Sequence, residues 1–581
     1  YLLLFAFIIF GVFGYGIGKI YGMSIYPDEF GYWANAAQEV GYDWREVTSL
    51  ASYYSYGYSM LLFPVLKFSS NGVMAYRIAI CINVLAQAGT LFLVKRIYVS
   101  IFPKVTRENV AMAVGMCILY PVWTFYSQMT LVESILVFLY LLGCYFLIRY
   151  LESSSTVMLT AATLLFIYMY MVHMRTIGVL IALMITLLTM IWQRREERSR
   201  LLGTFLLVVA GIVLIGVGKK YVSETIYSLS DANILAANGY GGKLRLIVQT
   251  LTGERTVSFL FGCTGKLYYL FMTSFGMIVP AVMFLLRQVK GLILIIYHKG
   301  EAVKWSFFSM FVLLSLLGQF AIAAFYMSGN ERLDVIFYGR YNDFLVPLVI
   351  GFGALELLQR GNFKKNYLWG SSAACGLFYI TYLALKNCKT DMIQGDFAAG
   401  INYITNDSTY TVEIDFIQSF MFSMVLISIV FISLYAAGKK GRAGAAITVI
   451  VILETGLALM LSSKYTYRYN EVNYADIRLC EHLMQEDNPR VSYLDEGDYQ
   501  YIDLVQFTLR ENPVHIIRQG EILEKNDGIS STRAINLDIV QEKVGKDGYL
   551  FIRLDSTSKE RLDSVFSVVE EGGHFVLLKA E

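Results

Sequence analysis

Long apolar runs recur along most of the chain, separated by shorter polar connections. About thirteen of these runs reach roughly 17 to 25 residues, the length with which an α-helix crosses about 30 Å of hydrocarbon. They cover residues 1–20, 74–94, 108–127, 131–149, 156–172, 176–192, 201–218, 267–286, 305–328, 343–358, 367–385, 413–437 and 443–462. The pattern predicts an α-helical, multi-pass protein of the cell membrane.

Basic residues mark every second connection between these runs. They are Lys95, Arg96, Lys104, Arg107, Arg149, Arg194, Arg195, Arg198, Arg200, Arg287, Lys290, Lys299, Lys304, Arg360, Lys364, Lys365, Lys439, Lys440 and Arg442. Short cytoplasmic loops carry such an excess of Lys and Arg. We therefore expect the first run to cross outward from the cytoplasm. An odd number of runs then leaves the chain from about Lys464 onward outside the cell.

Three external connections stand out by their length or charge, at residues 21–71, 221–265 and 328–342. The first contains an apolar stretch, residues 55–67, that is too short to span a bilayer. We expect this stretch to lie in the membrane interface as a helix, with Tyr56 and Tyr58 at the level of the lipid headgroups.

The composition changes to a soluble pattern at about residue 465. Short strand-like runs follow at 491–494, 514–518, 549–554, 566–569 and 574–578, and helical periodicity appears at 473–485 and 501–509. We predict two parts: a membrane module over 1–464 and a small extracytoplasmic α/β domain over 465–581. The second part lacks a phosphate-loop or dinucleotide-binding motif, so an accessory role is favoured over a second catalytic centre.

The overall composition agrees with a membrane protein. The chain of 581 residues is 56% hydrophobic and 16% charged, with a mean hydropathy of +0.52. Its net charge of +2 gives no indication of nucleic-acid binding. The seven cysteines show no paired spacing, so neither a disulfide framework nor a zinc site is predicted.

Two adjacent carboxylates, Asp28 and Glu29, follow directly after the first predicted span. A charge kept against apolar surface in a membrane chain indicates a functional site. Near apolar and aromatic neighbours, such a carboxylate can act as a general base toward a hydroxyl. The alternative is structural, because acids at the start of the helix beginning near Pro27 also favour its dipole. We predict a catalytic role for Asp28 and leave both readings open for Glu29.

Four more ionisable residues are expected at the same outer membrane level. Glu133 begins the fourth run, His173 and Arg175 lie between the fifth and sixth runs, and Arg340 precedes the tenth. Residues far apart in sequence that share one level can form a site built from loops on a rigid helical scaffold. We expect these residues to meet Asp28 in one pocket.

Each of these charged residues also has a simpler explanation. Arg175 and Arg340 suit a phosphate group of a lipid-borne substrate, because guanidinium geometry matches phosphate oxygens, but either arginine could instead anchor to membrane phosphates. Glu133 could simply cap its helix. Lys67 and Arg77 could steer an anionic headgroup, or extend to the interface as cations at helix ends often do.

Tyrosines near these charges are candidates for contact with a sugar or an acceptor. Tyr338 and Tyr341 flank Arg340, and Gly339 allows the backbone to turn beside them. Tyr56 and Tyr58 provide similar aromatic surface in the first external connection. The alternative for all four is an interfacial belt of tyrosines.

Together these features resemble the glycosyltransferase C fold. The resemblance rests on an outward first span, the Asp28-Glu29 pair, the interfacial helix and the Ala75-Tyr76-Arg77 segment that opens the next span. Glu133 is similar to a second acidic position, and Gly339-Arg340-Tyr341 to an arginine-tyrosine element before a late span. The superfamily includes protein O-mannosyltransferases, lipid A aminoarabinose transferases and mycobacterial arabinofuranosyltransferases, and the similarity covers the architecture of about 460 residues.

The resemblance implies transfer of a sugar from a polyprenyl phosphate carrier to an acceptor hydroxyl on the extracytoplasmic face, with inversion. Asp28 would then take the proton of the acceptor, while Arg175 and Arg340, with His173 or Lys67, would neutralise the leaving phosphate. Glu29 or Glu133 would orient the acceptor. Alternatively these carboxylates, with Asp28, would hold a divalent metal ion. The acceptor would be a cell-envelope glycan, a lipid or a protein.

Two other functions share the membrane setting. A polymerase or ligase for lipid-linked glycans would use a similar substrate on the same side. A flippase or other transporter of lipid-linked sugars would show repeated halves and charged or broken helices near the middle of the bilayer. The carboxylate pair in the first external connection favours the transferase.

Overall fold

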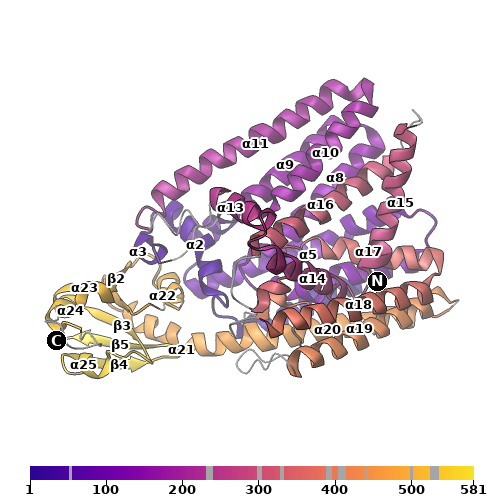
Figure 1. Cartoon of the computed structure of the whole chain (residues 1–581). Coiled ribbons are helices and arrows are strands. Elements are labelled where there is room, and N and C mark those ends of the chain that lie inside the picture. The colour runs from indigo at the N-terminus through magenta and orange to yellow at the C-terminus, as the bar shows by residue number, and fades with distance from the viewer. Residues whose placement is uncertain are drawn as a thin grey trace.

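The computed structural model describes residues 1–50, 55–230, 240–297, 304–327, 333–387, 395–403, 414–439, 441–497, 501–523 and 535–581. Figure 1 shows a large body of packed helices, with a small α/β unit beyond one end of it. This arrangement confirms the predicted fold class, an α-helical polytopic membrane protein with a small C-terminal α/β domain.

Within the described ranges, nine helices are long and apolar enough to cross a membrane. Their main segments are α1 (Leu2–Gly16), α5 (Gly72–Ile101), α8 (Val132–Ser153), α10 (Ile177–Gln193), α11 (Arg198–Thr225), α16 (Lys304–Met327), α18 (Phe363–Lys386), α19 (Ile414–Gly438) and α20 (Ala443–Ser462). A tenth candidate is the pair α14 (Thr256–Thr273) and α15 (Ile278–Tyr297), which bends by 103°. Phe275 and Gly276 have positive φ angles at this bend.

The prediction of thirteen spans exceeds the nine or ten helices that pass by length and composition. Three predicted runs form shorter helices. Residues 108–127 divide into α6 (Arg107–Ile118) and α7 (Pro121–Tyr126), because Pro121 starts a new helix. The other two runs become α9 (Thr156–Val172), of 17 residues, and α17 (Val346–Arg360), of 15. Most of α17 is buried, which explains its apolar sequence without a full crossing.

The connection over residues 21–71, which the sequence predicts to be external, contains three helices among its described residues. They are α2 (Tyr26–Val40), α3 (Arg45–Thr48) and α4 (Ser59–Phe68). The predicted short apolar helix is confirmed as α4, which packs on α2 and α5. The side chain of Tyr58 is buried and donates to Asn83 Oδ1 at 3.3 Å, so it packs inside the protein.

The last membrane helix runs on into the C-terminal domain without a loop. After α20 the chain makes a π-helical turn (Ser463–Tyr467) and continues as α21 (Arg468–Leu483), so that Ala443–Leu483 forms one helical rod of 41 residues. Figure 1 shows this rod leading from the helical body to the sheet. The predicted boundary at residue 464 falls inside the π-helical turn, and the two parts are joined by helix rather than by a linker.

The C-terminal domain contains one five-stranded sheet with the order β2-β1-β3-β5-β4. The strands are β1 (Val491–Asp495), β2 (Val514–Arg518), β3 (Tyr549–Arg553), β4 (Phe566–Glu571) and β5 (Phe575–Ala580), and they occur where the sequence predicts them. Strand β1 pairs in parallel with β2 and β3, whereas β5 is antiparallel to β3 and β4. The helices of the domain after α21 are α22 (Ile502–Leu509), α23 (Gln519–Ile522), α24 (Leu537–Val544) and α25 (Lys559–Leu562).

Helix α22 and the residue that follows it dock the domain onto the first external connection. Phe507 packs against Trp33, with ring centroids 4.9 Å apart. Arg510 donates to the backbone carbonyls of Leu66 at 2.7 Å and Ser69 at 2.8 Å, while its own carbonyl accepts from Trp44 Nε1 at 2.6 Å. The contact therefore combines ring packing with hydrogen bonds from a guanidinium.

We expect Arg510→Ala to lower the stability of the protein by about 2 kcal/mol, because two part-buried carbonyls lose their charged donor. The measurement is the thermal midpoint of the purified protein in detergent. Arg478→Ala is the matched control, because the Arg478 guanidinium is exposed and lies 3.6 Å from Glu570. Equal midpoints for the two variants would contradict the docking role of Arg510.

Candidate functional site

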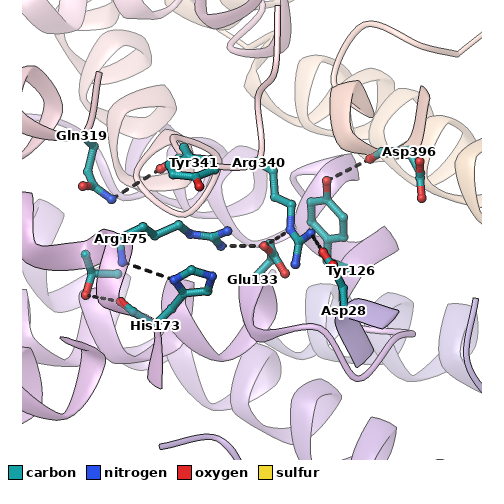
Figure 2. A network of polar contacts seen from close by, with 10 residues as sticks. Asp28, Tyr126, Glu133, His173, Arg175, Gln319, Arg340, Tyr341 and Asp396 are labelled. Carbon is teal, nitrogen blue, oxygen red and sulfur yellow. Dashed lines mark hydrogen bonds and ion pairs between the residues drawn. The ribbon is translucent and has the colours of Figure 1, made fainter. Parts of the chain in front are cut away.

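Four charged side chains from four separate segments meet in one cluster. Asp28 lies in the first turn of α2, Glu133 in the first turn of α8, Arg175 in the 3-10 turn η2 (Met174–Thr176), and Arg340 in the segment before α17. Arg340 donates through Nη1 to Asp28 and through Nε to Glu133, and Arg175 Nη2 donates to the same Glu133 oxygen at 2.5 Å. Figure 2 shows the resulting chain of contacts. The structure thus brings together the charges that the sequence placed at one level.

The four side chains of the cluster differ in their exposure. Those of Glu133, Arg175 and Arg340 are 2 to 3% exposed, whereas that of Asp28 is 22% exposed. Buried ions are tolerated when they are paired, and the two carboxylates here balance the two guanidiniums. Asp28 is the only one of the four that is partly exposed to solvent.

The charge state of Arg340 is set by its two partners. Burial alone would lower the pKa of this guanidinium, but the negative charges of Glu133 and Asp28 outweigh burial and raise the pKa well above its ordinary value. Arg340 therefore remains protonated and provides a fixed positive charge beside Asp28.

Several buried polar atoms around the cluster have unused hydrogen-bonding capacity. Within the part of the chain that the structure describes, Glu133 Oε2, Arg175 Nε and both side-chain polar atoms of Asn342 have no hydrogen-bond partner. Buried polar groups are nearly always paired with protein, water or ligand. These atoms therefore mark positions at which water or a polar ligand can bind.

Glu29 occupies a different environment from its neighbour Asp28. Its side chain is fully buried and accepts five hydrogen bonds, from the amides of Ser24, Ile25 and Thr130 at 2.7 to 2.9 Å and from the hydroxyls of Thr130 and Tyr76 at 2.7 and 2.5 Å. Both carboxylate oxygens are thus used by the protein. This geometry favours the structural reading over the catalytic one, since Glu29 joins the start of α2 to α5 and to the segment before α8.

His173 shapes the turn that presents Arg175. Its Nδ1 accepts a hydrogen bond from the backbone amide of Arg175 at 3.2 Å, and its carbonyl accepts one from the Thr176 hydroxyl at 3.0 Å. Figure 2 shows the imidazole beside the arginine on which it acts. The geometry supports an indirect role for His173, through the position of Arg175, in addition to any contact with a phosphate.

Aromatic rings cover the two arginines. The Arg175 guanidinium lies 5.1 Å from the ring centre of Tyr341, and that of Arg340 lies 4.9 Å from the ring centre of Phe397. Tyr338 packs between them, 5.6 Å from Tyr341 and 5.3 Å from Phe397. The two tyrosines predicted to flank the arginine therefore lie at the site, and they form an aromatic wall beside it.

One wall of the site could not be predicted from the sequence. The 3-10 turn η5 (Gly395–Ala398) contributes Phe397, whose carbonyl accepts from the amide of Gly339 at 3.1 Å. The neighbouring Asp396 carbonyl accepts from the Tyr126 hydroxyl at 2.9 Å. Neither turn residue lies in a recognisable motif, so this segment could not be identified from its residues. A side chain at Gly339 would overlap the ring of Tyr269, so this position requires glycine because of close packing.

Four of the predicted site residues lie elsewhere. Lys67 is exposed at the end of α4, and Arg77 donates to the carbonyl of Ile20 at 2.9 Å, so each serves a helix end rather than the cluster. The Tyr56 hydroxyl donates to the carbonyl of Ile215 on α11 at 3.2 Å. Tyr58 lies in the core, as described above. The sequence predicts the depth of a residue in the membrane but not the side of the helix bundle on which it lies.

The predicted carboxylates do not fit a metal ion. No group of three or more His, Cys, Asp or Glu side chains placed to hold a metal occurs in the described residues. The Arg340 guanidinium lies between Asp28 and Glu133, where a shared cation would have to bind, and Glu29 is occupied by its five donors. The Arg340 guanidinium thus occupies the place between these two carboxylates.

Another buried acid, Asp343, follows Arg340 in the same segment. Tyr269 donates to its Oδ1 at 2.8 Å, and its Oδ2 has no hydrogen-bond partner in the described ranges. Burial raises the pKa of Asp343 to about 7, although the hydrogen bond from Tyr269 acts in the opposite direction. Nothing in the residues around Asp343 indicates its burial, so its sequence context does not mark it as a site residue.

Comparison with known proteins identifies the fold. No protein-family model and no curated protein matches the sequence. Two solved structures of ArnT from Cupriavidus metallidurans are similar to this chain at 12% identity, and each comparison covers 99% of this chain and 97% of the other. The TM-score is 0.53 for ArnT bound to undecaprenyl phosphate and 0.51 for its apo state. The chain therefore has the glycosyltransferase C fold that its motifs resemble.

We expect Glu133→Gln to destabilise the protein by about 3 kcal/mol, because two buried guanidiniums lose a shared counter-charge. Thermal midpoints check this, with Glu108→Gln, an exposed acid at the start of α6, as the control. Asp28→Asn should cost less than Glu133→Gln, since Asp28 is partly exposed. A Glu133→Gln midpoint equal to that of the control would contradict the charge balance described for the cluster.

Asp343 should make stability depend on pH. Its pKa is higher in the folded chain than the ordinary 3.8, so the folded state binds this proton more tightly and stability falls as the pH rises from about 4 to about 7. Asp343→Asn should remove roughly 3 kcal/mol of the stability change between pH 5 and pH 7.5. Thermal midpoints at the two pH values measure this, with the exposed Asp563→Asn as the control. An unchanged pH dependence in Asp343→Asn would refute the assignment.

Proposed function

We propose that this protein is an integral membrane glycosyltransferase that moves a sugar from a polyprenyl phosphate donor to an acceptor hydroxyl. The observation that carries the proposal is a partly exposed carboxylate, Asp28, beside two buried guanidiniums, Arg340 and Arg175, on a glycosyltransferase C fold. This arrangement combines a base with cations for a leaving phosphate, which are the two requirements of the transfer.

The donor phosphate is assigned to the arginines. Guanidinium groups bind phosphate oxygens through parallel N–H donors, and burial strengthens that interaction. Among the described residues, Arg175 Nε has no hydrogen-bond partner. This N–H group can therefore donate to a phosphate without breaking an existing ion pair. The similarity to ArnT, whose structure was solved with undecaprenyl phosphate, supports a polyprenyl carrier as the lipid part.

The transfer is a single displacement at the anomeric carbon. The acceptor oxygen forms the new glycosidic bond on one face, and the bond from that carbon to the phosphate oxygen breaks on the other, which inverts the configuration. The electron pair leaves with the phosphate, beside Arg340 and Arg175, and the acceptor proton passes to Asp28. Phosphate needs no protonation to depart, so a second carboxylic acid is not required.

Arg340 connects the two halves of this mechanism. Without substrate it pairs with Asp28, and a carboxylate paired with a guanidinium is a weak base. A donor phosphate competes for the same guanidinium and lessens its hold on Asp28. Glu133 keeps both arginines in place during this exchange, because it is buried between them.

The aromatic wall is the proposed sugar contact. Tyr338, Tyr341 and Phe397 lie against the arginines, and flat rings offer an apolar face to a pyranose or furanose. We propose the extracytoplasmic side of the membrane for the cluster, because short basic connections are typical of the cytoplasmic side. Glycans, lipids and proteins of the cell envelope are therefore the acceptor classes to test.

We expect Asp28→Asn to reduce transfer at least 100-fold, because general base catalysis contributes about this much or more. The assay incubates purified protein in nanodiscs with a panel of polyprenyl phosphate sugars and acceptors, and detects product by mass spectrometry. Glu39→Gln is the matched control, since Glu39 is an exposed acid on the same helix.

The control should retain wild-type activity. Full activity of a folded Asp28→Asn protein would exclude Asp28 as the base. If neither the wild type nor the control forms product with any donor in the panel, the glycosyltransferase assignment itself is wrong.

A further inference from the structure

We propose that the C-terminal domain, residues 465–581, positions Asp28, and that Asn470 and Asn473 on α21 transmit this effect. The inference rests on the proposed function, because it takes Asp28 as the base, and it assigns the domain a task beyond that function. The structural basis is the segment from Tyr21 to Ile25, which leads from the first membrane helix into α2.

Side chains, rather than regular backbone structure, hold this entry segment in place. Asn470 Oδ1 accepts from the amides of Tyr21 at 2.7 Å and Gly22 at 2.8 Å. Its Nδ2 donates to the Ser24 hydroxyl at 3.2 Å and to the Thr466 carbonyl of its own helix at 2.9 Å. Asn470 is fully buried, so both ends of its amide are fixed.

Asn473 continues the same row of contacts one helical turn later. Its Nδ2 donates to the carbonyl of Met23 at 2.7 Å, and its Oδ1 accepts from the hydroxyl of Tyr26, the first residue of α2. Residues three apart on a helix lie on one face, so α21 presents both amides to the entry segment. Tyr26 is two positions before Asp28, which places this contact next to the proposed base.

Glu29 completes the support from the opposite side. Its carboxylate accepts from the amides of Ser24 and Ile25 and also from Tyr76 and Thr130, so Glu29 links the entry segment to α5 and to the segment before α8. The entry segment thus lies between two supports, one in each part of the protein. Loss of the α21 contacts should displace Asp28, while the contacts of Glu133 with Arg340 and Arg175 stay formed.

The α/β part of the domain also contacts the start of α2. The Tyr501 ring stacks on His574 at 3.8 Å and packs on Tyr26 at 5.0 Å, and His574 Nδ1 lies 2.6 Å from Asp476 Oδ2 on α21. Helix α21 also continues directly from the membrane helix α20. The domain therefore reaches the start of α2 through a rigid helix and a stacked aromatic contact.

The test uses the full-length protein with Asn470→Ala and Asn473→Ala, and Glu471→Ala as the control. Glu471 is an exposed residue of the same helix that faces away from the entry segment. We expect kcat to fall at least 10-fold in each Asn variant with less than a 3-fold change in the KM for the donor, because the base moves while the phosphate contacts stay. The control should match the wild type.

Hydrogen–deuterium exchange provides a readout that does not depend on activity. Amides of residues 21–29 should exchange at least 10-fold faster in both Asn variants, while those of β1, β3 and β5 keep their wild-type rates, which shows that the domain remains folded. Exchange unchanged in residues 21–29 would overturn the proposal. So would wild-type kcat in both folded variants.

The two readouts separate this proposal from the proposed function. Absence of product from the wild type and the control refutes the glycosyltransferase assignment, and exchange alone then decides whether α21 holds the entry segment. Product formation by the wild type with equal kcat in the Asn variants refutes only the positioning role.

Discussion

The position of Arg340 between two carboxylates is the constraint on which the site depends. A guanidinium cannot be buried in a membrane protein without counter-charge, and here Glu133 and Asp28 supply it from helices that are distant in sequence. Arg175 shares Glu133, so the starts of α2, α8 and α10 are all tied to the segment before α17. The charge balance therefore fixes the relative positions of four chain segments as well as their chemistry.

Adjacent acids at the start of α2 show how one helix can serve two purposes. Successive residues on a helix point about 100° apart, so Asp28 and Glu29 cannot face the same surroundings. Glu29 points inward, where amides and hydroxyls of three segments bind it, and Asp28 points toward the arginines, where part of its carboxylate stays exposed. The difference in role comes from geometry, since the chemistry of the two side chains is nearly the same.

Sequence patterns predicted the five strands and two of the helices (α21 and α22) of the C-terminal domain, the short helix α4 and the meeting of Asp28 with Glu133, Arg175 and Arg340. These predictions succeeded because hydrophobic period and charge report the secondary structure and the height of a residue in the membrane. The depth of a residue in the membrane does not determine on which side of the helix bundle it lies. For this reason the sequence assigns Lys67, Arg77 and Tyr56 to the site, although they contact other parts of the protein. Phe397 was missed because an aromatic residue in a short turn has no distinguishing pattern.

In a sugar transfer at a membrane surface, the phosphate-binding arginines and the base have opposite requirements. The arginines must be shielded, because water would weaken their interaction with a leaving phosphate, and a burial of 97% or more of the Arg175 and Arg340 side chains meets this demand. The base must instead be open to an acceptor, and Asp28 alone among the four is partly exposed. The buried, charge-balanced group of Glu133, Arg175 and Arg340, together with the partly exposed Asp28, satisfies both demands. It does so only while the start of α2 stays next to this group. Side chains from both parts of the chain bind the largely buried entry segment, which has no regular secondary structure of its own. In the proposed mechanism these contacts keep Asp28 in place.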